Sequence, residues 1–150
     1  MELSPEKQLE LLEKEYFHLN HVVENFDAKS LTIKAWNVTL AGSLSGAGAF
    51  TQHYELLFFA ACASVLFWFI DTYWKNFQFA HYQRIGEIEA YFAGRAEHTG
   101  CFKISESWSK SYRFKPHKRF YRIMFYPHVV LPHGVMSVAL FGTFFWLIYS

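Results

Sequence analysis

Histidine has the widest chemical use of the residues in this chain, since imidazole both transfers protons and binds metals. The chain has eight histidines, and two pairs lie close in sequence: His18 with His21, and His128 with His133. Glu15 or Glu24 could add a carboxylate to the first pair, but no CxxC or HExxH pattern completes a site. We therefore expect the histidines at surfaces or interfaces, with no metal and no cofactor.

Motifs of enzymatic chemistry are missing from the sequence. It contains neither a GxSxG nucleophile elbow nor the phosphate-binding patterns GxxxxGK and GxGxxG. An enzyme would need a nucleophile or a pair of acids presented in a pocket, and no group of residues in the sequence suggests either. We expect no catalytic residue and a protein that is not an enzyme.

Asp71 stands near the end of an apolar stretch, Leu56–Trp74, about six residues or roughly 9 Å from its centre. A carboxylate at the middle of a bilayer costs roughly 2.5–3.5 kcal/mol, and much less near the surface. We expect Asp71 to be solvated or paired with a lysine. A role in ion binding or gating is the alternative.

Basic residues gather between positions 75 and 122, where ten Lys or Arg face four Glu. Such a segment binds anionic lipid headgroups, and each juxtamembrane cation contributes roughly 1 kcal/mol. The alternative is a cytosolic partner protein or a nucleotide signal, bound beside Tyr112 and Phe120. Long nucleic acid is not expected, because the patch is small. The residues of this patch are Arg113, Lys115, Lys118 and Arg119.

Three apolar stretches must position these groups: Leu31–Phe50, Leu56–Trp74 and Leu131–Tyr149. Each approaches the roughly 20 helical residues that a bilayer core requires. The first two are separated by a very short turn and predict a hairpin. No glycine or proline interrupts Lys75–Ile85, so the second helix should continue into water and end near Gly94.

The first apolar stretch is unusually polar and rich in small residues. Gly42 and Gly46 form a GxxxG pair, which allows helices to approach closely in lipid. Asn37, Ser43 and Ser45 are hydrophilic without charge, and they could instead line a pore. Close helix packing and pore lining are both open for this face, and an oligomer could use both.

Ser4 and Pro5 predict a helix start, and apolar residues then recur with steps of three and four. This heptad pattern is typical of a helix–helix seam. The seam could form within the chain or between subunits of a homo-oligomer. A joint is expected at residues 26–30. The seam residues are Leu9, Leu12, Tyr16, Leu19, Val23 and Phe26.

These elements define an all-α, polytopic membrane protein with three transmembrane helices, a hairpin plus a C-terminal span, and a cytosolic helical region. The positive-inside rule places the basic segment in the cytosol, so the N-terminus is cytosolic and the C-terminus outside. The expected segments are 1–30, a cytosolic amphipathic helix; 31–75, the hairpin; 76–125, a cytosolic helix and basic segment; and 126–150, the C-terminal span.

The run from Phe26 to Trp36, followed by a hairpin and by WKNFQFAHYQRIGEIE at 74–89, resembles small bacterial membrane proteins. This layout is similar to the SLATT-type two-transmembrane effectors of bacterial conflict systems, to which the chain adds a third apolar stretch. The resemblance implies an inner-membrane homo-oligomer that perturbs the bilayer, as a pore or depolarising effector in anti-phage defence. An accessory subunit of a larger membrane complex is the alternative.

Overall fold

The computed structural model describes residues 4–97, 99–114 and 116–149, and this part of the chain is entirely helical apart from its turns. The expected all-α class is therefore confirmed. The residues outside these ranges include Lys115 and the C-terminal residue Ser150. The helices are α1 (Pro5–Thr51), α2 (Glu55–Phe92), α3 (Ile104–Arg113), α4 (Pro116–Met124), α5 (Pro127–Val130) and α6 (His133–Tyr149).

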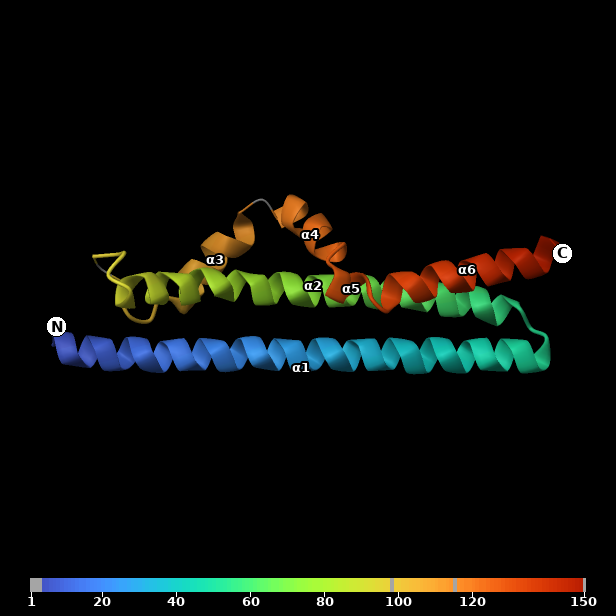
Figure 1. Ribbon diagram of the computed structural model, residues 1–150, viewed down its shortest axis with the longest axis horizontal. Coiled ribbons are helices and arrows are strands. Elements are labelled where there is room, and N and C mark those ends of the chain that lie inside the picture. Colours follow the sequence, from blue (N-terminus) through green and yellow to red (C-terminus); the bar gives the residue numbers. More distant parts are fainter. Residues whose placement is uncertain (1–3, 98, 115, 150) are drawn as a thin grey trace.

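Two long helices form the frame of the molecule. They lie antiparallel, and the turn between them is at the opposite end from the N-terminus (Figure 1). The Ser4 side chain caps α1 by accepting a hydrogen bond from the Lys7 backbone N–H at 3.3 Å. Gln52, in the left-handed conformation with φ of 61°, ends it. As the sequence predicts, α2 continues without interruption and ends shortly before Gly94.

The expected joint at residues 26–30 is wrong, because α1 runs through it as one helix of 47 residues. At 1.5 Å per residue it is about 70 Å long. At such a joint either Asp27 or Ser30 could cap a new helix, because both residue types are favoured at the N-cap. Their side chains instead bond across to Lys75 and Asp71 of α2, so they are not used on the backbone of α1.

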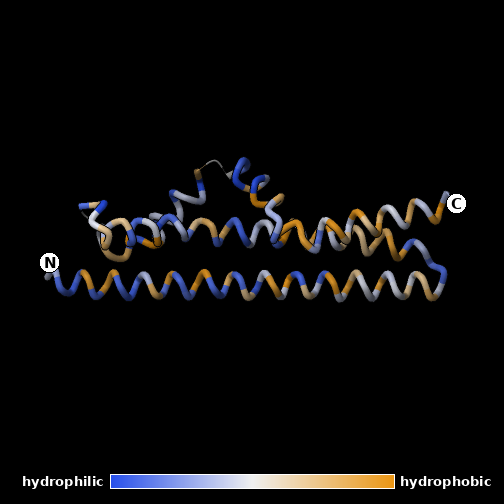
Figure 2. Tube along the Cα trace, viewed as in Figure 1, coloured by the Kyte–Doolittle hydropathy of each residue, from blue (hydrophilic) through white to orange (hydrophobic). Residues whose placement is uncertain are grey.

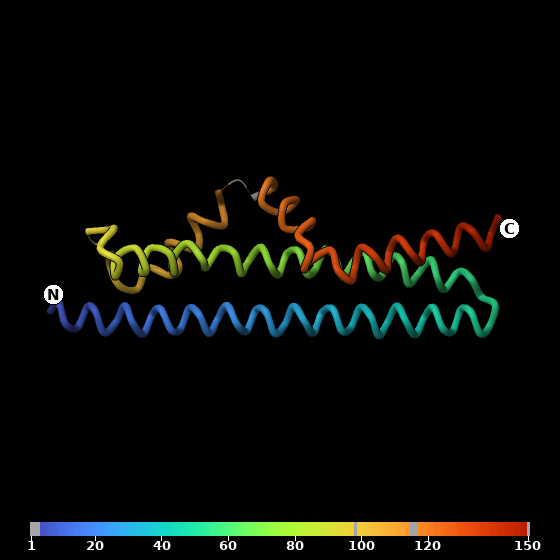
Figure 3. The backbone as a smooth tube through the Cα atoms, in the orientation of Figure 1, coloured from blue at the N-terminus to red at the C-terminus, as the bar shows by residue number. Residues whose placement is uncertain are grey.

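The remaining helices pack mainly on α2 and lie on its far side from α1 in Figures 1 and 3, although α6 also contacts α1. Helix α6 lies along the first half of α2, where Phe58 contacts Phe141 and Phe144. Helix α3 covers the second half, where Trp108 contacts Phe77. Helix α4 covers the middle, where Phe120 contacts Phe69 and Tyr73, and the short α5 joins α4 to α6. Pro127 and Pro132 bracket α5, because proline starts a helix well and cannot continue one.

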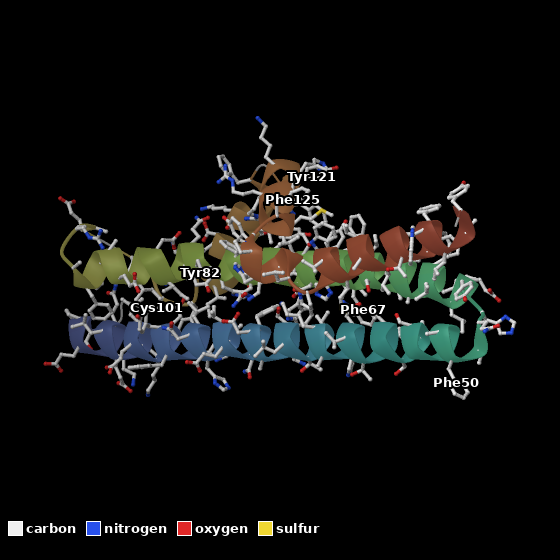
Figure 4. The ribbon with its side chains drawn as sticks, turned by 45° about the vertical axis from the view of Figure 1, so that its right-hand side comes forward. Phe50, Phe67, Tyr82, Cys101, Tyr121 and Phe125 are labelled. Carbon is white, nitrogen blue, oxygen red and sulfur yellow. The ribbon has the colours of Figure 1, made fainter. Side chains whose placement is uncertain are left out.

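The molecule has an apolar end and a polar end, which the hydropathy colours of Figure 2 separate along its length. We call the apolar end the part formed by residues 31–51, 55–74 and 133–149. Large apolar side chains point outward there, including Leu66, 64% exposed, and Val138, 74% exposed. Phe50 also projects away from α2 (Figure 4). An apolar surface of this kind suits a lipid environment rather than water.

One helix within the described residues, α2, is long and apolar enough to cross a membrane by itself. Helix α6 is also apolar but has only 17 residues, and α1 does not meet the same criterion. The structure thus gives one candidate span rather than three of equal quality. The polarity of the first stretch is the physical reason, since Lys34, Asn37 and the serines lower its hydropathy.

Candidate functional site

Four polar side chains from three helices meet at the boundary between the apolar and polar ends. Ser30 and Lys34 lie one turn apart on α1, Asp71 comes from α2, and His133 begins α6. Residues four apart share a helix face, so α1 presents both of its side chains to α2. We call this group the boundary cluster.

The carboxylate of Asp71 organises the boundary cluster. Its Oδ1 accepts a hydrogen bond from Ser30 Oγ at 2.5 Å, and its Oδ2 accepts one from Lys34 Nζ at 2.5 Å. The Lys34 ammonium also donates to Ser30 Oγ at 2.7 Å. His133 Nε2 lies 3.5 Å from Asp71 Oδ2. Asp71 is therefore the lysine-paired acid that the sequence predicts, with Lys34 as its partner.

Burial makes the boundary cluster energetically important. The side chains of Asp71 and His133 are both 0% exposed, and that of Lys34 is 17% exposed. Removing one partner from a buried ion pair leaves an uncompensated charge, which typically costs 3–5 kcal/mol. Chemically, a carboxylate, an ammonium and an imidazole in contact can hold a proton or pass it on. Within the described ranges, no three His, Cys, Asp or Glu residues gather to hold a metal ion.

Further polar groups follow the boundary cluster into the apolar end. Asn37 of α1 and Ser64 of α2 are both 0% exposed, and Ser137 lies one turn beyond His133 on α6. Asn37 Oδ1, Ser64 Oγ and both ring nitrogens of His133 lack hydrogen-bond partners among the described residues. Buried polar atoms are normally paired, so this interior line is unusual. The apolar end is thus apolar outside and partly polar inside.

The predicted packing or pore residues do not share one face of α1. Asn37 is buried, and Ser45 is half-buried with its hydroxyl bonded to the Ala41 carbonyl at 2.6 Å. Gly42, Ser43 and Gly46 are exposed. For both of these glycines, an added Cβ would meet no described atom within 4 Å. The face of α1 that carries Gly42, Ser43 and Gly46 is therefore left uncovered by the described part of the chain.

The close approach within the hairpin occurs at Gly48, which the sequence reasoning missed. A Cβ at this position would lie 3.1 Å from the His53 carbonyl oxygen and 3.2 Å from Leu56 Cβ. Those distances leave no room for a side chain without movement of the turn. The signal was present, since Gly48 is the last glycine before the short turn.

Most of the seam residues pack against α2 of the same chain. Leu12, Leu19 and Val23 form a buried core with Ile85 and Ile88 of α2. Tyr16 donates a hydrogen bond to Glu89 at 3.2 Å, and the Phe26 ring lies 4.9 Å from that of Trp74. Leu9 is 41% exposed. Of the two roles left open for this seam, the packing against α2 accounts for its three most buried members.

A second buried ion pair lies beside this core at the polar end. Arg84 bonds to both carboxylate oxygens of Glu15, at 2.7 and 3.1 Å. Its remaining N–H groups reach Glu87, Thr99 and the Gly100 carbonyl. All five N–H groups of the guanidinium thus have acceptors. Arg84 ties α1, α2 and the loop after α2 together, which is a structural role.

The residues of the basic patch differ in their surroundings, since one is held by hydrogen bonds within the chain and two are exposed. Arg119 is half-buried, and its guanidinium bonds to Asn76 Oδ1 at 2.7 Å and to the Ser111 carbonyl at 2.8 Å. Burial lowers the pKa of Arg119. This residue therefore anchors α4, whereas Arg113 and Lys118 are exposed and remain available to a partner. Lys115, the fourth predicted member, lies outside the described residues.

Sequence reasoning missed Ser30 and His133 as members of the boundary cluster. A usable signal existed, because ionisable residues at the ends of apolar stretches pair with one another when water is excluded. Comparisons of the chain with models of known protein families, with curated proteins and with solved structures give no match. The site must therefore be interpreted from its own geometry.

Proposed function

We propose that this chain is an integral protein of the bacterial inner membrane, anchored by the apolar end. In this arrangement the hairpin of α1 and α2 and the helix α6 cross the bilayer. The N-terminus is cytosolic, and the end of α6 is outside. Support comes from the outward apolar side chains and from the position of the hairpin turn and the end of α6 at the same end of the molecule (Figure 1). A buried charge cluster at the boundary suits this arrangement, because it avoids the bilayer centre.

The proposed activity is non-enzymatic: copies of the chain assemble and permeabilise or depolarise the membrane. One observation carries this proposal, namely the uncovered small face of α1 at Gly42, Ser43 and Gly46. In lipid, such a face associates with another helix through close backbone contact. The similarity of layout to SLATT-type effectors supports a role in anti-phage defence.

Release of a dye from vesicles tests this activity, together with native mass spectrometry of the purified protein. Gly46→Leu places a large side chain on the uncovered face, and we expect it to dissociate the oligomer and abolish dye release. Gly142→Leu is the matched control, since Gly142 is an equally open, exposed glycine of α6. Unchanged oligomers and unchanged leakage in the Gly46 variant would contradict the proposal.

A second candidate function is that of an accessory subunit in a larger membrane complex. A groove of about 550 Å³ at the polar end favours this role. Phe17 and Phe92 line the groove, and Glu13 and Glu89 flank it. Phe17 is 63% exposed and Phe92 is 54% exposed, which is unusual for a surface in water. Copurification of a different chain in fixed stoichiometry from a native membrane would support this role over the effector.

A further inference from the structure

A pocket of about 410 Å³ opens between α1 and α2 next to the boundary cluster, and His128 of α5 contributes to its wall. Its lining includes Lys34 and Lys75, with Asp27 beside them. If the apolar end spans the bilayer, as the proposed function requires, this pocket lies at the level of the lipid headgroups. We call it the boundary pocket.

The two lysines of the boundary pocket are held in place and are not fully used. Lys34 Nζ bonds to Ser30 and Asp71, and Lys75 Nζ bonds to Asp27 and, at 2.9 Å, to Gln78. An ammonium has three N–H donors, so these contacts with the described residues leave one on each lysine. Their side chains are only 17% and 9% exposed, respectively. Two fixed donors therefore face one pocket with little conformational entropy left to lose.

Asp27 gives the boundary pocket an acidic side. Its carboxylate bonds to Lys75, yet its side chain remains 54% exposed. Partial burial opposes ionisation, but the hydrogen bonds of Lys75 and Gln78 outweigh it and lower the pKa of Asp27. The residue is thus a carboxylate at neutral pH. With Asp71 neutralising Lys34 and Asp27 neutralising Lys75, the pocket has almost no net charge.

A ligand that matches this pocket carries a negative and a positive group close together. A purely anionic headgroup gains little, because both lysines are already neutralised. A choline headgroup cannot donate a hydrogen bond to Asp27, because its nitrogen has no hydrogen. A phosphate joined by a short linker to a primary amine satisfies both sides. Leu31, which is 67% exposed, starts the apolar surface along which an acyl chain can continue.

We propose that the boundary pocket binds the headgroup of an amine-bearing phospholipid of the phosphatidylethanolamine class. The phosphate accepts the spare N–H donors of Lys34 and Lys75, and the lipid ammonium donates to Asp27. This inference rests on the proposed membrane location and adds a lipid specificity to it.

Native mass spectrometry of the full chain, released from vesicles into mild detergent, tests the lipid assignment. The vesicles contain equal amounts of phosphatidylethanolamine, phosphatidylcholine and phosphatidylglycerol. We expect phosphatidylethanolamine to be retained about tenfold over each of the others, as loss of one charged hydrogen bond implies. Equal retention of the three lipids, or a preference for phosphatidylglycerol, would overturn the assignment.

Variants locate the contact. Asp27→Asn should remove the preference for ethanolamine over choline, and Lys75→Gln should reduce retention of both. Lys29→Gln, an exposed lysine near the pocket on α1, is the matched control and should change nothing. Because Lys75 is buried, the Asp27 variant decides the outcome if the Lys75 variant misfolds. An unchanged preference in Asp27→Asn refutes the proposal.

Two further measurements distinguish failure of the lipid assignment from failure of the proposed membrane function. Soluble glycerophosphoethanolamine, which has no acyl chains, should be retained at least about tenfold less than the lipid. Equal retention would mean that the ligand comes from the aqueous phase. Insertion and dye release are recorded in the same vesicles. A protein that inserts and releases dye without a lipid preference overturns the lipid site alone, whereas a protein that does not insert overturns the proposed function as well.

Discussion

Two buried ion pairs join α1 to α2, one at the polar end and one at the boundary with the apolar end, and they differ in how completely their polar groups are hydrogen-bonded. At the polar end, every N–H group of Arg84 has an acceptor, including both oxygens of Glu15. At the boundary, Asp71 has Lys34 and Ser30 as partners, but the ring nitrogens of the adjacent His133 have no hydrogen-bond partner among the described residues. The complete pair holds the fold together. The incomplete one leaves capacity for a proton or a change of partners.

The largest expected effect comes from breaking the complete pair. Arg84→Met leaves Glu15 buried at 6% side-chain exposure without a counter-charge. Loss of one partner of a buried pair costs about 3–5 kcal/mol, so the variant should lose much of its stability. Thermal unfolding followed by circular dichroism in detergent measures this. The double variant Glu15→Met with Arg84→Met should recover most of the loss, and a double variant as unstable as the single one would contradict the argument.

A smaller effect is expected at the incomplete pair. Asp71→Asn keeps the shape of the side chain but removes the charge that compensates Lys34. Since Lys34 lines the boundary pocket, its ammonium can be hydrated, and we expect a loss of about 2 kcal/mol. The same unfolding measurement applies. A loss equal to that of Arg84→Met would show that the two pairs are equally closed to water, and the contrast between them would fail.

The sequence predicted where the helices lie in the chain far better than which helices pack against one another. Ser4 and Pro5 marked the start of α1, and the steps of three and four correctly marked Leu12 and Leu19 as an apolar face. The spacing of apolar residues identifies the apolar face of a helix, however, and does not say which other helix covers that face. The expected joint failed for the same reason, because Asp27 and Ser30 look like caps until α2 supplies other partners.

The candidate site was harder to predict than the core. Asp71 was expected to have a lysine partner, but only the antiparallel register of α1 and α2 selects Lys34. In the sequence, Arg84 directly precedes Ile85, and a charged residue in such a helical stretch usually faces water. Its burial depends on Glu15, which lies 69 positions earlier in the chain. Local patterns carry no information on such a distant pair.

The glycines of α1 extend the comparison between its covered and uncovered surfaces. Gly48→Ala places a Cβ 3.1 Å from a backbone oxygen of the turn, so we expect a loss of about 1 kcal/mol. Gly42→Ala meets no described atom within 4 Å and should gain about 0.5–1 kcal/mol through helix propensity. Both are measured as monomer unfolding in detergent. Equal signs for the two substitutions would show that the turn yields without cost.

The smallest effect is expected from an exposed ion pair at the polar end, which contrasts with both buried ones. Hydrogen bonds from Lys14 and Lys7 lower the pKa of Glu10 to about 2. Because the folded-state pKa is depressed, the stabilisation is present above the usual glutamate pKa and is lost as the pH falls toward 2. Glu10→Gln should therefore be less stable than the unmodified chain above about pH 4, and this difference should shrink to nothing as the pH falls toward 2. Acid titration of the unfolding midpoint at low salt detects this difference, and 1 M salt should abolish it, since salt screens exposed charges and hardly affects buried ones. A difference that persists in 1 M salt would mean that Glu10 acts through packing, and its contrast with Glu15 would then concern contacts rather than charge.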